Sequence, residues 1–318
     1  MTMDNFIFSL NATLPIFLII LFGWFLMQIG LFNKEFTTVA DRYVFKVALP
    51  LLCFKDIATA NIREMFSLKF VLFCAIGTTL MFLGVWLFAR WYCKDKSMTG
   101  AFAQAAARGS AAILGIAFVE NIYGNSGMAP MMIISAVPLY NIFSVVILTF
   151  GASDAQDEPI AKTIRRACIN VIKNPIIIGI LIGSVFAIGG IPVPKIPLKF
   201  ITNIAATASP IALLVVGATF EGRKALAKIK PSLMATLIKL VIIPAIFFPF
   251  AILFGFRGSE LVAILVMLGS PTTVSCYIMA KNMHNDAVLT SSIVVMATLL
   301  SSVSLTLWIF LLRSFALI

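Results

Sequence analysis

Charged residues are scarce in this chain of 318 residues. Asp, Glu, Lys and Arg together make up 12% of it, whereas about a quarter of the residues are charged in ordinary soluble domains. Hydrophobic residues make up 61%, and the mean hydropathy is +1.04. A water-soluble fold has too little interior to bury so much apolar surface. The composition therefore excludes a soluble protein and indicates a chain that lies within a membrane.

Histidine is almost absent, since His284 is the only one, and the five cysteines include no Cys-x-x-Cys pair. Metal sites and acid–base catalysis usually need several such side chains close together. We therefore expect no metal, no cofactor and no enzymatic activity. We expect free thiols packed in or near membrane helices instead of a disulfide framework. The cysteines are Cys53, Cys74, Cys93, Cys168 and Cys276.

Apolar runs of about 20 residues recur along nearly the whole chain, and that length crosses a bilayer core of roughly 30 Å as a helix. Polar and glycine-containing segments separate the runs. The sequence thus predicts an all-α polytopic membrane protein. Its ten predicted transmembrane helices are 10–30, 36–59, 68–91, 97–122, 127–150, 174–190, 196–220, 231–255, 258–281 and 286–312. In the longest gap, 151–173, residues 160–171 predict an amphipathic helix on the membrane surface.

Proline, glycine and arginine positions repeat at a constant offset of 160 residues, which indicates an internal duplication. We divide the chain into a first repeat (1–150), a linker (151–173) and a second repeat (174–318). Each repeat holds five spans, an odd number, so the two are inverted in the membrane. Inverted repeats are typical of secondary transporters, whose substrate site lies near the membrane midplane. The matched pairs are Pro15 and Pro175, Gly23 and Gly183, Gly30 and Gly190, Pro50 and Pro210, Arg63 and Arg223, Gly109-Ser110 and Gly269-Ser270, and Asn125 and Asn285.

The net charge of +11 is carried by short loops, which indicates topology signals and not nucleic-acid binding. If the N-terminus lies outside, fourteen of the 24 Lys and Arg residues fall in inner segments and seven in outer segments. Inner loops of membrane proteins are enriched in Lys and Arg. We therefore expect both termini outside the cytoplasm, the linker 151–173 inside, and a location in the cell inner membrane.

The fourth and ninth spans carry Gly-Ser pairs in register, and Pro271 follows the second pair. A transporter must interrupt its helices where the freed backbone lines a cavity. If both spans unwind here and cross, the helix ends that follow present free N–H groups, which bind carboxylates. The alternative is close helix packing at Gly-Ser and an ordinary kink at Pro271. The candidate substrate-binding residues at the two breaks are Gly109, Ser110, Ala111, Ala112, Ser270, Pro271, Thr272 and Thr273.

Arg108 is a further candidate, because it lies about a dozen residues into the fourth span, immediately before the break. A base at membrane depth is costly and marks a functional site by default. We expect Arg108 to neutralise an anionic substrate. The alternative is an Arg that reaches the interface or pairs with a structural acid such as Glu120.

Four other polar residues within the spans are candidates for coupling or secondary contacts. Glu120 is the best-placed acid for proton coupling, although a solvated charge at a helix end is the alternative. Asn141 has interhelical hydrogen bonding as its default interpretation. Lys46 and Lys239 contact the pocket or extend to the membrane interface. Both H⁺ and Na⁺ remain open as the coupling ion.

Four segments resemble the auxin efflux carrier family in its bacterial branch, which includes malonate and malate permeases. The resemblance covers essentially the whole chain and implies a ten-helix inverted repeat like that of bile-acid and sodium–proton carriers. It implies that helices 1, 2, 6 and 7 form a scaffold and dimer surface. Helices 3–5 and 8–10 would form a transport domain that moves as an elevator. The segments are VFKVALPLLCF (44–54), NPIIIGILIG (174–183), ASPIALLVVGATF (208–220) and LGSPTTVSCYIMA (268–280).

Within this resemblance, residues 110–115 and 270–273 line the crossing of the fourth and ninth helices. The first crossing segment departs from the family pattern, because Ser110, Ala111 and Ala117 stand where relatives often carry Asn or Pro. The substrate therefore stays open among mono- and dicarboxylates such as malonate, malate or auxin-like acids. We expect a secondary carrier with membrane lipid and a second copy of the chain as partners. The alternatives are a channel-like or sensory membrane subunit.

Overall fold

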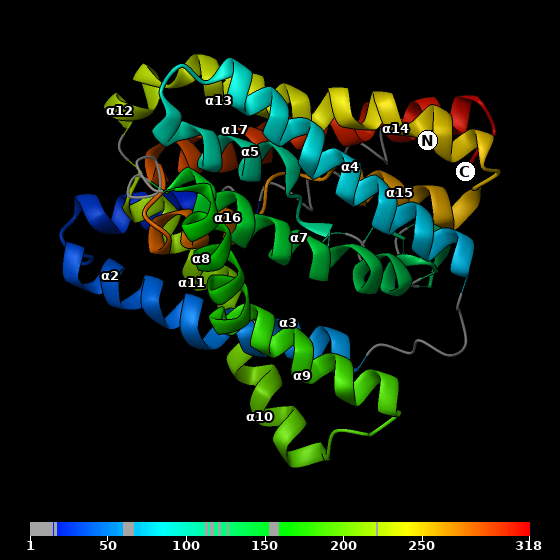
Figure 1. The fold of residues 1–318 in the computed structure, drawn as a ribbon, viewed down its shortest axis with the longest axis horizontal. Coiled ribbons are helices and arrows are strands. Elements are labelled where there is room, and N and C mark those ends of the chain that lie inside the picture. Colours follow the sequence, from blue (N-terminus) through cyan, green and yellow to red (C-terminus); the bar gives the residue numbers. More distant parts are fainter. Residues whose placement is uncertain are drawn as a thin grey trace.

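The computed structural model describes residue 15 and residues 18–59, 67–111, 114, 118–119, 122–125, 127–152, 159–220 and 222–318. These residues form helices joined by short connections, without a β-strand (Figure 1). The first is the apolar helix Leu18–Gln28. The others are α2 (Lys34–Tyr43), η1 (Val44–Ala48), α3 (Leu49–Ala58), α4 (Leu68–Tyr92), η2 (Lys96–Met98), α5 (Thr99–Ala107), α7 (Ala129–Gly151), α8 (Ile160–Lys173), α9 (Pro175–Gly189), α10 (Lys195–Ala206), α11 (Ala208–Ala218), α12 (Gly222–Ala227), α13 (Ile229–Leu237), η4 (Ile238–Ile242), α14 (Ile243–Leu253), α15 (Gly258–Gly269), α16 (Ser275–Asn282) and α17 (Ala287–Ser314).

Five helices in the described ranges are long and apolar enough to cross a membrane. They are α4, α7, the continuous helix of α10 and α11, the continuous helix of α13, η4 and α14, and α17. A sixth is added if α8 and α9, which meet at 55°, count as one broken span. The predicted class, an all-α polytopic membrane protein, is confirmed. The count of ten spans stays a prediction, because five or six helices in the described ranges are long and apolar enough for a full crossing.

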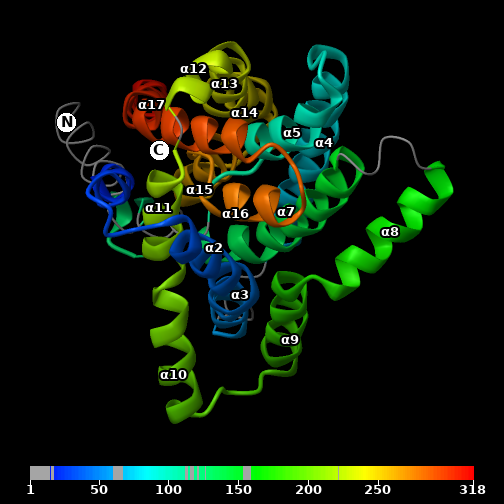
Figure 2. The same ribbon diagram turned by 90° about the vertical axis from the view of Figure 1, so that its left-hand side faces the viewer.

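The bend between α8 and α9 is encoded locally. Pro175 begins α9, and the Asn174 side chain caps that helix by accepting a hydrogen bond of 2.9 Å from the N–H of Ile176. Proline at the first position and Asn at the cap are typical of a helix start. The predicted amphipathic helix 160–171 corresponds to α8, which runs outward from the body of the molecule (Figure 2).

Two π-helical turns interrupt otherwise continuous helices, and each ends two residues before a proline. Pro50 follows η1, and Pro244 follows η4. Proline has no N–H and its ring clashes with the carbonyl four residues earlier, so a wider turn accommodates it. In the second case the carbonyl of Leu240 is freed, and the indole N–H of Trp308 donates to it at 2.9 Å.

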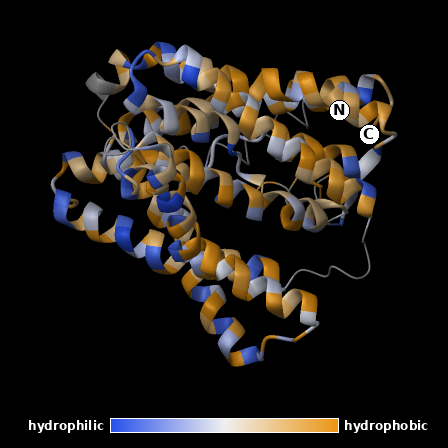
Figure 3. Cartoon of the chain, in the orientation of Figure 1, coloured by the Kyte–Doolittle hydropathy of each residue, from blue (hydrophilic) through white to orange (hydrophobic). Residues whose placement is uncertain are grey.

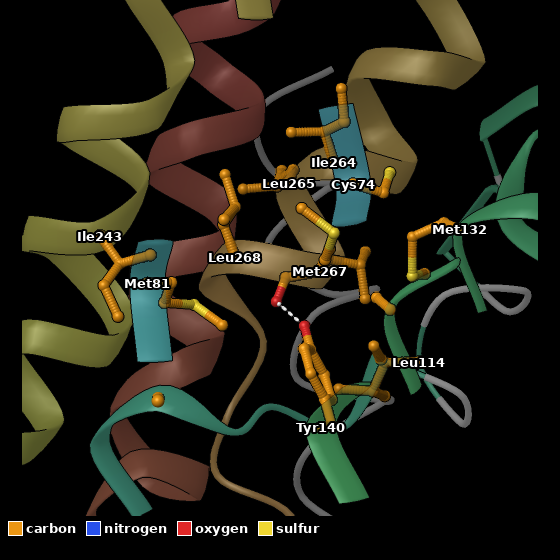
Figure 4. Close-up of a cluster of buried hydrophobic side chains, with 14 of the residues drawn as sticks. Cys74, Met81, Leu114, Met132, Tyr140, Ile243, Ile264, Leu265, Met267 and Leu268 are labelled. Atoms are coloured by element: carbon orange, nitrogen blue, oxygen red, sulfur yellow. Dashed lines mark hydrogen bonds between the residues drawn. The ribbon is translucent and has the colours of Figure 1, made fainter. Parts of the chain in front are cut away.

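The interior is built around α5 and α15. All nine residues of α5 are buried, and so is α15 from Leu261 to Gly269. Close-packed apolar side chains surround the end of α15, where the Tyr140 hydroxyl donates to the carbonyl of Met267 at 2.7 Å (Figure 4). In contrast, the outer faces of α4 and α9 expose large apolar side chains. Hydrophobic residues make up most of the helices (Figure 3). Such a surface is suited to lipid and not to water.

Buried apolar residues form two clusters. One draws mainly on α4, α5, α7, α13, α14, α15 and α17. The other draws mainly on the helix Leu18–Gln28, α2, η1, α3, α9, α11 and α16. Glycines let backbones approach closely in the second cluster, as is usual between membrane helices.

Two of these glycine contacts follow the 160-residue offset. A Cβ added at Gly23 would collide with the carbonyl oxygen of Leu214 in α11. A Cβ added at Gly183 in α9 would lie 2.8 Å from the carbonyl oxygen of Phe54 in α3. Gly183 is 160 residues after Gly23, and Leu214 is 160 residues after Phe54. The contact between the first helix and α11 thus recurs, in matched positions, between α9 and α3.

Candidate functional site

The two Gly-Ser pairs lie where two buried helices end. Helix α5 ends at Ala107, and α15 ends at Gly269. Beyond these ends the two extended segments meet: the N–H of Ser110 donates to the carbonyl of Pro271 at 2.9 Å, and Gly109 forms an isolated antiparallel bridge with Thr272. The predicted interruptions therefore lie at 108–110 and 270–274, and they contact each other.

Side chains stabilise this crossing by donating hydrogen bonds to backbone carbonyls at the helix ends. The hydroxyl of Thr272 donates to the carbonyl of Ala105 at 2.8 Å. The ammonium of Lys239 donates to the carbonyls of Ala107 and Leu268 at 3.0 and 2.8 Å. The last carbonyls of a helix have no partner within it. Groups from neighbouring segments therefore supply the hydrogen bonds that these carbonyls lack within their own helices.

A cavity of about 60 Å³ lies beside the crossing, between α3, α7 and α11. That volume holds a few water molecules or a small carboxylate. The N–H groups of Val274 and Ser275, at the start of α16, donate to no acceptor in the described part of the chain. The residues of the two interruptions that line the cavity are Arg108, Gly109, Ser110, Ala111, Thr273, Val274 and Ser275.

Among the described residues that line this cavity, Arg108 is the cation, and it is 6% exposed. Its guanidinium donates to the amide oxygen of Asn141 at 3.0 Å, to the hydroxyl of Ser144 at 3.3 Å and to the sulfur of Met279 at 2.9 Å. All three partners are neutral, and no described carboxylate pairs with Arg108. A buried charge without a described counter-ion is costly, and an anion bound in the cavity would lower that cost.

Asp56 also lines the cavity, and sequence reasoning missed it. Its carboxylate lies 2.9 Å from the ammonium of Lys55, and both side chains are partly exposed. The two residues stand near the end of a predicted span, where charged pairs are ordinary, so no pattern in the sequence distinguishes them. Only the packing of α3 against the crossing brings Asp56 to the same cavity as Arg108.

The other candidates lie elsewhere. Ser270 is fully buried behind Gly109, and its hydroxyl has no hydrogen-bond partner in the described ranges. Lys46 is exposed in η1 and does not line the cavity. Pro271, Thr272 and Lys239 belong to the crossing but not to the cavity lining. Ala112 and Glu120 lie outside the described residues. Among the residues described, no three His, Cys, Asp or Glu side chains are grouped to hold a metal ion.

A pair of substitutions separates the two hydroxyls at the second break. Thr272→Val should lower the free energy of unfolding by about 1–3 kcal/mol, because it leaves the buried Ala105 carbonyl without its donor. Ser270→Ala removes a hydroxyl without a partner among the described residues, so it should leave stability unchanged or slightly raised. Thermal unfolding of the purified variants measures both. Equal losses would contradict the assignment of the Thr272 bond to the crossing.

Residues 8–309 match the membrane transport protein family, which includes the auxin efflux carriers. An uncharacterized transporter of Methanothermobacter thermautotrophicus is 24% identical over 304 residues, covering 95% of this chain and 98% of the relative. An uncharacterized transporter of Methanocaldococcus jannaschii is 21% identical over 94% of this chain and 97% of its own. The uncharacterized transporter YfdV of Escherichia coli is 24% identical over 68% and 70%, respectively.

Proposed function

The chain belongs to the membrane transport protein family, and from that premise we propose that it is a secondary active carrier of small organic anions, mono- or dicarboxylates. The observation that carries the proposal is the buried Arg108 guanidinium, which lines the cavity at the helix crossing and contacts only neutral partners among the described residues. Its charge, the N–H groups at the start of α16 that have no acceptor among the described residues, and the small cavity volume suit a carboxylate.

We propose the ten-helix inverted repeat as the architecture around this site. The matched contacts of Gly23 with Leu214 and of Gly183 with Phe54 support it. The two apolar clusters support a scaffold with the first, second, sixth and seventh helices and a transport domain with the other six, because these four helices share the second cluster, which also includes α16 at its contact with them. Movement of the transport domain past the scaffold, in the manner of an elevator, would carry the crossing from one side to the other. A homodimer through the scaffold helices completes this proposal.

We propose further that both termini lie outside the cytoplasm and that the chain lies in the cell inner membrane. The support is the excess of Lys and Arg on one side of the spans. Two ion pairs, Lys228 with Asp286 and Lys281 with Asp41, join helix ends on that side. Hydrophilic residues gather there, at the left-hand end in Figure 3.

Uptake by proteoliposomes tests the function. Purified protein is reconstituted, and uptake of labelled malonate, malate and indole acetate is followed with imposed pH or Na⁺ gradients. We expect saturable uptake of at least one carboxylate that depends on a gradient. Uptake that does not saturate would favour a channel. If no carboxylate moves or competes, the anion assignment fails.

Asp56 is the carboxylate that lines the cavity in the described ranges, and it gives a test of proton coupling. An anion bound beside Arg108 would repel the charge on Asp56, and a nearby like charge favours the protonated form of a carboxyl group. Binding of substrate and of a proton would then reinforce each other. We expect Asp56→Asn to abolish the response of uptake to a pH gradient while uptake without a gradient persists. Glu35→Gln, on exposed α2, is the control and should respond like the wild type.

A further inference from the structure

Lys239 is a fully buried cation that the proposed substrate site does not use. It lies in the π-helical turn η4, and its side chain reaches the place where α5 and α15 end. The ammonium donates to the carbonyl of Ala107 at 3.0 Å, to that of Leu268 at 2.8 Å and to that of Met267 at 3.4 Å. An ammonium has three N–H groups, so these three carbonyls use all of them.

The three acceptors share one electrostatic property. Ala107 is the last residue of α5, and Met267 and Leu268 belong to the last turn of α15. The carbonyl end of a helix carries a negative partial charge and attracts cations. No carboxylate in the described part of the chain pairs with Lys239. The negative partial charges at the ends of α5 and α15 therefore balance its positive charge.

Backbone carbonyls and helix ends of this kind bind the coupling Na⁺ in transporters with broken helices. We propose that the ammonium of Lys239 is a built-in cation that occupies such an ion position at the crossing. The crossing is then stable without bound Na⁺, and the carrier works without Na⁺. Gly109 is part of the arrangement, because a Cβ there would lie 2.9 Å from the ammonium nitrogen. The lysine thus fills the space that a separate ion and its entry path would need.

The thermal unfolding temperature tests this role without reference to any substrate. Purified wild-type protein should unfold at the same temperature in sodium chloride and in choline chloride of equal ionic strength. Lys239→Ala removes the ammonium and three methylene groups and should lower that temperature by several degrees. Because n-propylammonium has the size of the missing group, it should restore at least half of the loss. Tetramethylammonium has no N–H to donate and should restore none.

Lys239→Met is the matched variant, since it fills much of the same volume without a charge. We expect it to be destabilised like Lys239→Ala but not restored by n-propylammonium, because no space is left. Wild-type stability that requires Na⁺ would overturn the proposal. So would a Lys239→Met protein as stable as the wild type, or a Lys239→Ala protein that n-propylammonium does not restore. If Lys239→Ala does not accumulate, the salt comparison on the wild type and Lys239→Met decide.

A second test, which measures uptake by proteoliposomes, rests on the proposed carrier function. Wild-type proteoliposomes should take up the transported carboxylate equally in sodium and choline media. Absence of any carboxylate uptake would contradict the proposed function, but the unfolding temperatures would still test the role of Lys239. Uptake that stops without Na⁺ would overturn the built-in cation while confirming a carrier.

Discussion

Arg108→Gln should abolish carboxylate uptake while expression and thermal stability stay near those of the wild type. The substitution removes the positive charge from the cavity but keeps a polar side chain with hydrogen-bond donors on the side of Asn141 and Ser144, the partners of the guanidinium. Hydrogen bonds to charged groups contribute about 1.5–3 kcal/mol each. Loss of the two hydrogen bonds that the guanidinium would donate to the substrate carboxylate raises the half-saturating substrate concentration by about a hundredfold or more. Initial rates of labelled uptake over a range of substrate concentrations measure the change.

Two controls define this result. Arg108→Lys keeps a charge but not the planar pair of donors that fits a carboxylate, so an intermediate loss is expected. Arg42→Gln removes a charge from the exposed surface of α2, away from the cavity, and should leave uptake unchanged. Unchanged apparent affinity in Arg108→Gln would remove Arg108 from the substrate site, and its role would then be to bind α7 and α16 together.

The features predictable from the sequence are those with a local signal. Apolar runs of about 20 residues predicted the polytopic helical class, and the family resemblance is confirmed by a match over residues 8–309. Gly109-Ser110 and Gly269-Ser270 predicted two interruptions, and helices α5 and α15 end there. Glycine, serine and proline disfavour helix continuation through their own backbone properties, so a single sequence is enough to find them.

Features that depend on packing could not be predicted from the sequence. Lys46 and Lys239 had the same interpretation in the sequence, yet the first is exposed and the second is fully buried. The difference arises because the turn η4 packs beside α5 and α15, whereas Lys46 points out from η1. Asp56 and the pairing of Arg108 with its three partners were missed for the same reason, although Asn141 itself was a candidate for interhelical hydrogen bonding. Asn141, Ser144 and Met279 are 33, 36 and 171 residues from Arg108 along the chain.

Gly109→Ala should lower the thermal unfolding temperature and abolish uptake, although it adds one methyl group. The new Cβ would collide with the hydroxyl of Ser270 and would lie 2.9 and 3.0 Å from Nζ and Cε of Lys239. The Lys239 side chain is long, but its bonds to three carbonyls fix its end. Overpacking of this kind costs about 1–3 kcal/mol. Circular dichroism on heating and labelled uptake measure the two effects.

Gly84→Ala is the matched control for this prediction, and it should change stability in the opposite direction. Gly84 lies in the middle of α4, and a Cβ there meets no described atom within 4 Å. Alanine in a helix interior is favoured over glycine by about 0.5–1 kcal/mol. In Gly109→Ala/Ser270→Ala the collision with the hydroxyl is gone and the contact with Lys239 stays. If that double variant recovers full stability, Ser270 alone crowds the position. If it stays destabilised, the cost comes from displacing the ammonium from the helix ends, and uptake should stay lost with it.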